Sequence, residues 1–207
     1  MQRNYPLMAL LLLVFLGAAG AACAASVTYD IDPDHTYPSF EADHLGGLSV
    51  WRGKFNHSRG VVMLDKTAKR GSVHIVVDVA SIDFGLDQLN AIARGPKLFD
   101  AKKYPKAVYD GRLTDFVDGA PTRVVGRLTL HGVTRPLDLT LDSFKCIPDP
   151  LVKRERCGAD ALAHLKRDAF GIDAGKDYGF RMDVTLRIQV EAIAKPDGTA
   201  AGNHQML

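Results

Sequence analysis

Apolar and polar residues alternate along most of the chain, and the alternation is clearest in residues 123–144. In residues 124–130 every second position is apolar or glycine, and in residues 137–141 leucine alternates with a polar residue. A period of two with one apolar face predicts antiparallel strands whose other face meets water. Residues 131–135 between them predict a turn, and Pro136 fits a ladder only at a strand's start or edge. We therefore expect a hairpin that needs other strands to cover its apolar face.

Further strands are predicted wherever the same period recurs between turn residues. Eight or more strands with short turns, and no regular alternation with helices, are typical of an all-β antiparallel barrel or sandwich. A barrel interior is either packed solid or holds one small ligand. We expect residues 146–157 to form a loop, and strands at residues 27–32, 36–45, 50–55, 60–65, 71–82, 107–116, 160–170 and 184–190.

One segment changes period. Residues 86–94 place Leu86, Leu89, Ile92 and Ala93 on one side of a short helix, which Gly95 and Pro96 end. In a chain otherwise made of strands, this helix is a candidate lid over one barrel end.

The chain begins with a predicted export signal. Residues 7–22 are almost wholly apolar, and residues 22–24 fit the small-x-small pattern of a signal-peptidase site. We expect residues 1–24 to be a cleaved signal peptide and the protein to reside in the periplasm. Lipidation of Cys23 is the alternative. Residues 25–194 form the barrel domain, and residues 195–207 are expected to be disordered.

Charge and cysteine content narrow the chemistry. Removing Arg3 with the signal takes the formal charge from +2 to +1, so no basic field indicates nucleic acid. Export leaves Cys146 and Cys157, an even pair in an oxidising compartment, which predicts a disulfide. The seven histidines show no metal-ligand spacing, and no nucleophile motif is present, so we expect neither a metal nor an enzyme.

Four sequence blocks resemble the YceI-like family of exported lipid-binding proteins. They are YDIDPDH at residues 29–35, LFDAKKYP at 98–105, GRLTLHGVTRP at 126–136 and RDAFG at 167–171. They occur in the family's order and span nearly the whole mature chain. The resemblance implies an extended lipocalin-like barrel that binds a polyisoprenoid or similar long-chain amphiphile, with no catalytic residues and no cofactor besides that lipid. Leu98 and Tyr109 stand where the family usually has phenylalanine.

The resemblance and strand parity together give a candidate ligand-binding set. Its aromatic members would otherwise be read as core. His44 meets a ligand head group or caps strand ends, and Arg167 is paired structurally or contacts the ligand. Small Ala107 and Gly126 on the inward faces predict a void beside them. The set is Phe40, His44, Phe55, Ile75, Val77, Phe84, Leu89, Ile92, Leu98, Phe99, Tyr109, Leu128, Leu139, Phe170 and Leu186.

The predicted function is binding or carriage of a long-chain isoprenoid or similar lipid in a barrel tunnel. The alternatives are a structural or stress-response partner protein with a filled barrel and, ranked lower, an enzyme on isoprenoid or quinone substrates. Partners allowed by the sequence are the lipid, a membrane surface in transient contact, and a second copy of the chain.

Overall fold

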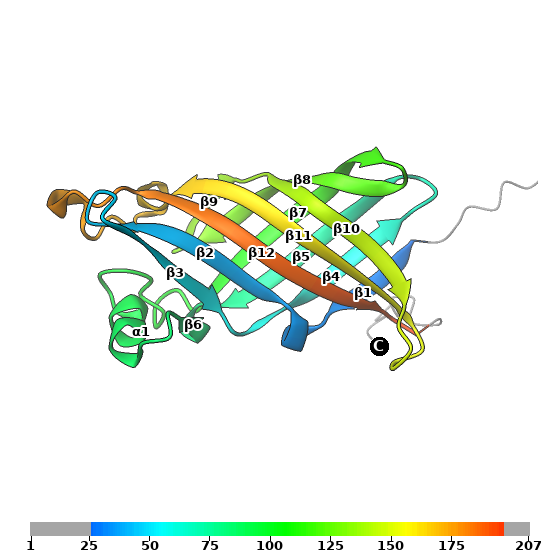
Figure 1. Cartoon of the computed structure of the whole chain (residues 1–207), viewed down its shortest axis with the longest axis horizontal. Coiled ribbons are helices and arrows are strands. Elements are labelled where there is room, and N and C mark those ends of the chain that lie inside the picture. The colour runs from blue at the N-terminus through cyan, green and yellow to red at the C-terminus, as the bar shows by residue number, and fades with distance from the viewer. Residues whose placement is uncertain (1–25, 197–207) are drawn as a thin grey trace, which may run out of the picture.

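The computed structural model describes residues 26–196, which form strands, one α-helix and four 3-10 helices (Figure 1). The predicted signal peptide and Cys23 lie outside the described residues, as does most of the predicted tail. None of the helices within residues 26–196 is long and apolar enough to cross a membrane. The strands are β1 (Val27–Ile31), β2 (Tyr37–His44), β3 (Ser49–Phe55), β4 (Ser58–Asp65), β5 (Arg70–Asp78), β6 (Ile82–Asp83), β7 (Lys106–Val117), β8 (Ala120–Leu130), β9 (Val133–Pro136), β10 (Leu139–Pro148), β11 (Glu155–Lys166) and β12 (Asp183–Ala194). The helices are η1 (Pro33–His35), η2 (Val79–Ser81), α1 (Asp87–Arg94), η3 (Arg167–Phe170) and η4 (Lys176–Tyr178).

Eight strands close an antiparallel barrel in the order β1-β4-β5-β7-β8-β10-β11-β12. The ring is completed by β1 pairing with β12, from Tyr29 opposite Ala194 to Ile31 opposite Ala192. The predicted all-β, lipocalin-like barrel with one short helix is confirmed. Closure removes the exposed edges that an open sheet of this size would leave.

At the barrel end that carries α1, one part of the wall is not joined by a strand ladder. The first half of β12 leaves β1 and pairs with β2, and the sheet continues from β2 to β3 and β6. Within the described residues β6 pairs with β3 alone, so no ladder joins it to β5 or β7. Leu98 and Phe99, which follow α1, bridge this side because they pack against both the core cluster that contains Val79 and the core cluster that contains Ile82.

The central hairpin has a tighter turn than the sequence predicts. The chain reverses at His131 and Gly132 alone, with φ angles of 53° and 76°, and Leu130 pairs with Val133. Two residues of positive φ match the twist of antiparallel strands, which is why two-residue turns of this kind join hairpins. Residues 133–135, predicted as turn, therefore form β9 together with Pro136, and β10 begins at Leu139 after a break of two residues.

Two predicted strands end early in 3-10 turns. The stretch 71–82 is β5 only to Asp78, whose carboxylate accepts a hydrogen bond from Ala80 N (2.9 Å) and starts η2. The stretch 160–170 is strand only to Lys166, and η3 ends at Gly171 in the left-handed conformation. In both places a local turn replaces the ladder and leads into the loops of the same barrel end.

The segment between the two cysteines is partly strand, so the predicted loop is too long. β10 runs to Pro148 and β11 begins at Glu155, which leaves six residues, 149–154, between them. Cys146 and Cys157 face each other in the ladder, with Cα atoms 4.0 Å apart, and form the predicted disulfide. The disulfide therefore joins two paired strands at the barrel end away from α1.

Candidate functional site

A cavity of about 470 Å³ lies inside the barrel. Alternate residues of each strand point inward, so Ile75, Tyr109, Leu128 and Leu186 reach it from β5, β7, β8 and β12. Their strand neighbours of opposite parity, such as Arg127 and Arg187, face the outside. The volume lies within the range of about 300–1,000 Å³ that is usual for ligand pockets.

Twelve of the fifteen candidate binding residues border this cavity. His44, Ile92 and Phe170 are placed elsewhere. The residues that line it are Phe40, Phe55, Ile75, Val77, Phe84, Leu89, Leu98, Phe99, Tyr109, Leu128, Leu139 and Leu186.

Ile92 is turned away from the cavity and is 55% exposed. The helix α1 docks instead through Asn90 and Ala93, which are its buried residues. The Asn90 side chain accepts a hydrogen bond from Phe84 N (2.7 Å) and donates one to Asp83 (3.1 Å). These two bonds set the rotation of the helix about its axis. Asn90 is therefore buried where the apolar pattern predicted Ile92, and Ile92 and Leu86 are exposed.

Phe170 and His44 flank the cavity without lining it. Phe170 is fully buried and packs in a cluster with Val79 and Ile172, so it is core. The His44 ring stacks on Trp51 with centroids 4.3 Å apart and meets the edge of Phe180. His44 also lies 3.4 Å from Ser49 Oγ across the start of the β2–β3 hairpin. It thus supports two aromatic residues of the cavity wall from behind.

Trp51, Phe180 and two charged residues form the mouth of the cavity. Trp51 lines the cavity and is also 37% exposed, so the cavity reaches the surface here. Asp43 accepts hydrogen bonds from Gly46 N (2.9 Å) and Arg181 N (2.8 Å). The bond from Arg181 N contributes most to lowering the Asp43 pKa, so the carboxylate is charged at neutral pH.

Arg167 is the second charged residue at the mouth. Its Nη1 donates to Ile172 O (2.9 Å) and its Nη2 to Ala174 O (2.7 Å). Burial lowers the Arg167 pKa, while the carboxylates of Asp168, Asp173 and Asp43 oppose that shift. Within residues 26–196 no carboxylate oxygen lies within 4.0 Å of its guanidinium. The structural role expected for Arg167 is present in these carbonyl bonds, and the side chain also borders the cavity.

Sequence reasoning missed the mouth because two of its parts have no period. Residues 171–182 contain Gly171, Gly175 and Gly179, all with positive φ, and their backbone turns at each glycine. Within this glycine-rich loop, Phe180 was the one signal available in the sequence. A second signal lay in β3, where Trp51 has the same parity as Gly53 and Phe55 and so faces the same side of the strand.

The void expected beside Gly126 is absent. The Tyr109 ring covers this glycine, so that an added Cβ would lie 2.3 Å from Tyr109 Oη. The hydroxyl donates to Leu137 O (3.0 Å), which fixes the ring there, and burial raises the Tyr109 pKa. Ala107, the other small residue, does line the cavity.

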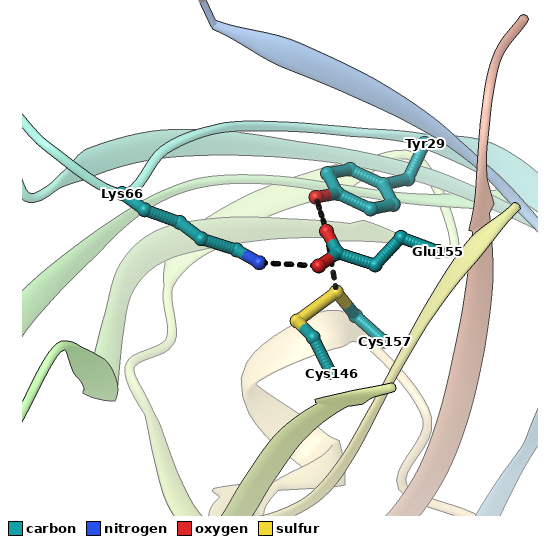
Figure 2. The surroundings of a disulfide bond; sticks show 5 residues. All are labelled: Tyr29, Lys66, Cys146, Glu155 and Cys157. Atoms are coloured by element: carbon teal, nitrogen blue, oxygen red, sulfur yellow. Dashed lines mark hydrogen bonds and ion pairs between the residues drawn. A yellow bond between two sulfur atoms is a disulfide. The ribbon is translucent and has the colours of Figure 1, made fainter. Parts of the chain in front are cut away.

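At the opposite end from the mouth, the cavity reaches Tyr29 and Cys157. Figure 2 shows Glu155 between the Tyr29 hydroxyl, which donates to it, and Lys66 Nζ at 2.6 Å, beside the disulfide. Burial raises the Tyr29 pKa, and the Glu155 carboxylate raises it further. Burial acts to raise the Glu155 pKa, but the bonds from Lys66 and Tyr29 outweigh it and lower the value. Polar side chains thus tie β1, β11 and the turn that follows β4 together at this end.

Two groups of side chains have metal-ligand atoms close together in the described part of the chain. In the first, Cys146 and Cys157 are already bonded to each other. In the second, Arg156 Nη1 lies 2.5 Å from Asp32 and 3.0 Å from Glu191, and His35 Nδ1 lies 2.9 Å from Asp32. A cation of the protein itself therefore occupies the second group.

A closed antiparallel barrel with an apolar cavity open at one end defines a lipocalin-like barrel. The sequence model of the YceI-like domain matches residues 29–192, and the chain belongs to this family. A UPF0312 protein of Pectobacterium atrosepticum is 29% identical over 189 residues, covering 90% of this chain and 96% of that protein.

Two solved structures share the fold at low identity. The Campylobacter jejuni YceI protein has a TM-score of 0.61 and 21% identity, covering 72% of this chain and 88% of that one. A domain of Saccharophagus degradans, described as polyisoprenoid-binding, has a TM-score of 0.57 and 17% identity, covering 81% of this chain and 98% of that one.

Proposed function

We propose that this protein binds and carries a long-chain isoprenoid, or a similar amphiphilic lipid, in the periplasm without catalysing a reaction. The observation that carries the proposal is the apolar cavity that runs from Trp51 at the mouth to Cys157 at the other end. A described relative in fold is a polyisoprenoid-binding domain, which agrees with this cargo. The apolar run of residues 7–22 and the disulfide both favour an exported, oxidised protein.

The cavity wall matches a hydrocarbon chain rather than a polar ligand. Its lining is made almost entirely of aliphatic and aromatic side chains. Each buried CH₂ group contributes about 0.8 kcal/mol, so a long chain gains affinity from length and needs few polar contacts. The polar end of the lipid would then lie at the mouth, where Arg167 and Asp43 are charged and reachable.

A binding role is favoured over catalysis by the titratable groups of the wall. They are Asp43, Arg167, Tyr29 and Tyr109. The pKa of Asp43 is lowered and those of both tyrosines are raised, so these three shifts lead away from neutral pH. Burial lowers the Arg167 pKa, but the ordinary pKa of an arginine lies far above neutral pH. General acid–base catalysis works best with a group whose pKa lies near the working pH.

The first test is the identity of the lipid that the protein carries. Protein isolated from the periplasm of its own cells should yield a long-chain amphiphile in an organic extract, at close to one molecule per protein, by mass spectrometry. Ala107→Phe should lose most of this lipid, because the new ring enters the cavity beside Val77 and Leu128.

The matched control is Val108→Phe, which places the same ring on the opposite face of β7. It should keep its lipid, and circular dichroism should show both variants folded. A wild-type protein without any extractable lipid would reject the proposal and favour a partner protein that works with an empty barrel.

A further inference from the structure

We infer that the barrel end that carries the cavity mouth docks on an anionic lipid bilayer. The mouth rim consists of the β2–β3 hairpin, α1 with residues 95–105, and the loop of residues 171–182, all at one end of the barrel (Figure 1). The inference deepens the proposed function, since a lipid carrier must meet the membrane that supplies or receives its lipid.

Large apolar side chains are exposed on each segment of the mouth rim. Leu48 on the hairpin is 74% exposed, Ile92 on α1 is 55% exposed, and Tyr178 in the loop is 81% exposed. Single exposed apolar residues are normal on a protein surface, but a group of them around one opening marks an interaction site. Leu45, Val50 and Leu86 add to the group.

Contacts between the three segments make the rim one continuous surface. Arg181 joins the loop to the hairpin, because its N donates to Asp43 and its Nη2 donates to Gly46 O (3.2 Å). Phe84 joins the hairpin to α1, since its ring lies 6.4 Å from that of Trp51 and its N donates to Asn90. The exposed apolar residues therefore surround the cavity mouth instead of lying on independent loops.

The charge beside this apolar surface favours a membrane as the occupant. The segment of residues 94–106 has five basic residues and a single acidic one, Asp100. In the described part of the chain, none of the five forms an ion pair with a carboxylate. Apolar side chains beside unpaired basic residues are the pattern of proteins that lie on anionic bilayers. The basic residues are Arg94, Lys97, Lys102, Lys103 and Lys106.

The test is flotation of the protein with lipid vesicles. The chain from Ala25 onward is used, because it holds the whole barrel and lacks the apolar run of residues 7–22, which would bind vesicles by itself. Vesicles of equal parts phosphatidylcholine and phosphatidylglycerol should bind it, and vesicles of phosphatidylcholine alone should bind it much less. Leu48→Asp and Lys97→Glu/Lys102→Glu should each weaken binding about tenfold or more.

The matched controls lie away from the rim. Leu151 is 88% exposed in the loop at the opposite barrel end, and Lys145 is exposed on β10. Leu151→Asp and Lys145→Glu should leave vesicle binding within about twofold of wild type, since neither residue would touch the bilayer. Absence of vesicle binding, or an equal loss of binding in rim and control variants, would overturn the inference. A protein partner would then be the alternative occupant of this surface.

Lipid content measured on the same preparations separates this inference from the proposed function. Protein that carries its lipid but does not bind vesicles retains the proposed function and loses the docking surface. Protein that binds vesicles through the rim but carries no lipid loses the proposed function and retains the docking surface.

Discussion

At the scale of single residues, the cavity is shaped by side chains that occupy the space beside glycines. Tyr109 lies over Gly126 and also touches the space beside Gly111, where an added Cβ would lie 3.1 Å from its ring. The hydroxyl that distinguishes Tyr109 from the phenylalanine usual in the family is bonded to Leu137 O and so belongs to the wall. The extra polarity is therefore satisfied by the barrel and is not offered to a ligand.

Gly126→Ala should lower the free energy of unfolding by about 1–3 kcal/mol, as overpacking of a filled core does. The new Cβ would approach Tyr109 Oη to 2.3 Å and Asp110 O to 2.7 Å, and the backbone oxygen cannot move aside cheaply. Gly158→Ala on β11 is the control, because the new Cβ would lie 3.6 Å from the Glu191 side chain and 3.7 Å from Val190 O, which are ordinary contact distances. Urea unfolding of the two variants checks this, and equal stabilities would contradict it.

Parity predicted the cavity wall well because each regular strand residue has only two directions to face. Phe40, Val77 and Leu139 were placed from alternation and do line the cavity. Ile92 could not be placed in this way, because the rotation of α1 depends on the hydrogen bonds of Asn90 with Phe84 N and the Asp83 side chain. The spacing of apolar residues does not predict such polar contacts. Phe170 lies in η3, where a strand's parity no longer applies.

At the scale of elements, the lid is the segment that follows α1 as much as the helix itself. Phe99 N donates to Ala93 O (3.0 Å), which folds the segment back onto the helix. The Phe99 ring then meets the edge of Phe55 at 5.8 Å and borders the cavity. Like Phe99, Leu98 packs against the core cluster that contains Val79 and the core cluster that contains Ile82.

Phe99→Ala should weaken lipid binding about tenfold or more, because burial of a phenylalanine contributes about 1.5–3 kcal/mol. Its melting temperature should fall less than this loss of affinity implies, since Phe99 is only half-buried without ligand. Calorimetric titration with geranylgeraniol measures the affinity. Ile92→Ala, on the exposed face of α1, should bind as wild type does, and an unchanged affinity in Phe99→Ala would remove the segment from the lid.

The elements themselves were predictable where a period existed and not where turns replaced it. β7 matches its predicted extent to within one residue at each end, and β8 and β12 contain their predicted runs and extend beyond them, because long alternating runs leave no competing structure. The 3-10 turns η2 and η3 and the loop of residues 171–182 depend on side-chain caps and glycine conformations, which have no period. Half of the cavity mouth lies in these segments, so the mouth was the part of the site that the sequence concealed.

At the scale of the whole molecule, the two barrel ends are built differently. The mouth end has loops, a helix and exposed apolar side chains. The opposite end has the disulfide and a cluster of ion pairs around Arg156, whose Nε lies 2.6 Å from Asp149 and whose Nη1 contacts Asp32 and Glu191. These bonds join Asp32, the N-cap of η1, to the loop of residues 149–154 and to β12. Covalent and ionic links therefore hold the strands together at this end.

The Arg156 cluster should make stability depend on acid pH. Burial acts to raise the Asp32 pKa, but hydrogen bonds from Arg156 and His35 outweigh it and lower the value. The hydrogen bond from Arg156 contributes most to lowering the Asp149 pKa. A carboxyl group whose folded pKa is lowered contributes stability above its unfolded pKa, about 3.9, and that contribution is lost as pH falls through the folded pKa.

Arg156→Gln should therefore be less stable than wild type at pH 7, and the difference should shrink below about pH 4 as the carboxylates are protonated. Urea unfolding of both proteins at pH 7, 5 and 3 gives this difference directly. Lys145→Gln, an exposed residue of β10 with no ion pair in the described chain, should show no such trend. A difference that stays constant from pH 7 to pH 3 would exclude the ion pairs as its source.

The missing ladder between β6 and the strands β5 and β7 has a consequence for how a long tail enters. Separating two neighbouring barrel strands breaks a row of backbone hydrogen bonds. No ladder joins β6 to β5 or β7, and this side is bridged by the side chains of Leu98 and Phe99 and by a backbone hydrogen bond from Val79 N to Pro105 O (3.0 Å). We call this part of the wall, between β6 with α1 on one side and β5 with β7 on the other, the seam. For the proposed lipid carrier docked on a bilayer, this seam would admit the tail sideways, so that it would leave the bilayer gradually and would not be drawn end-first through water.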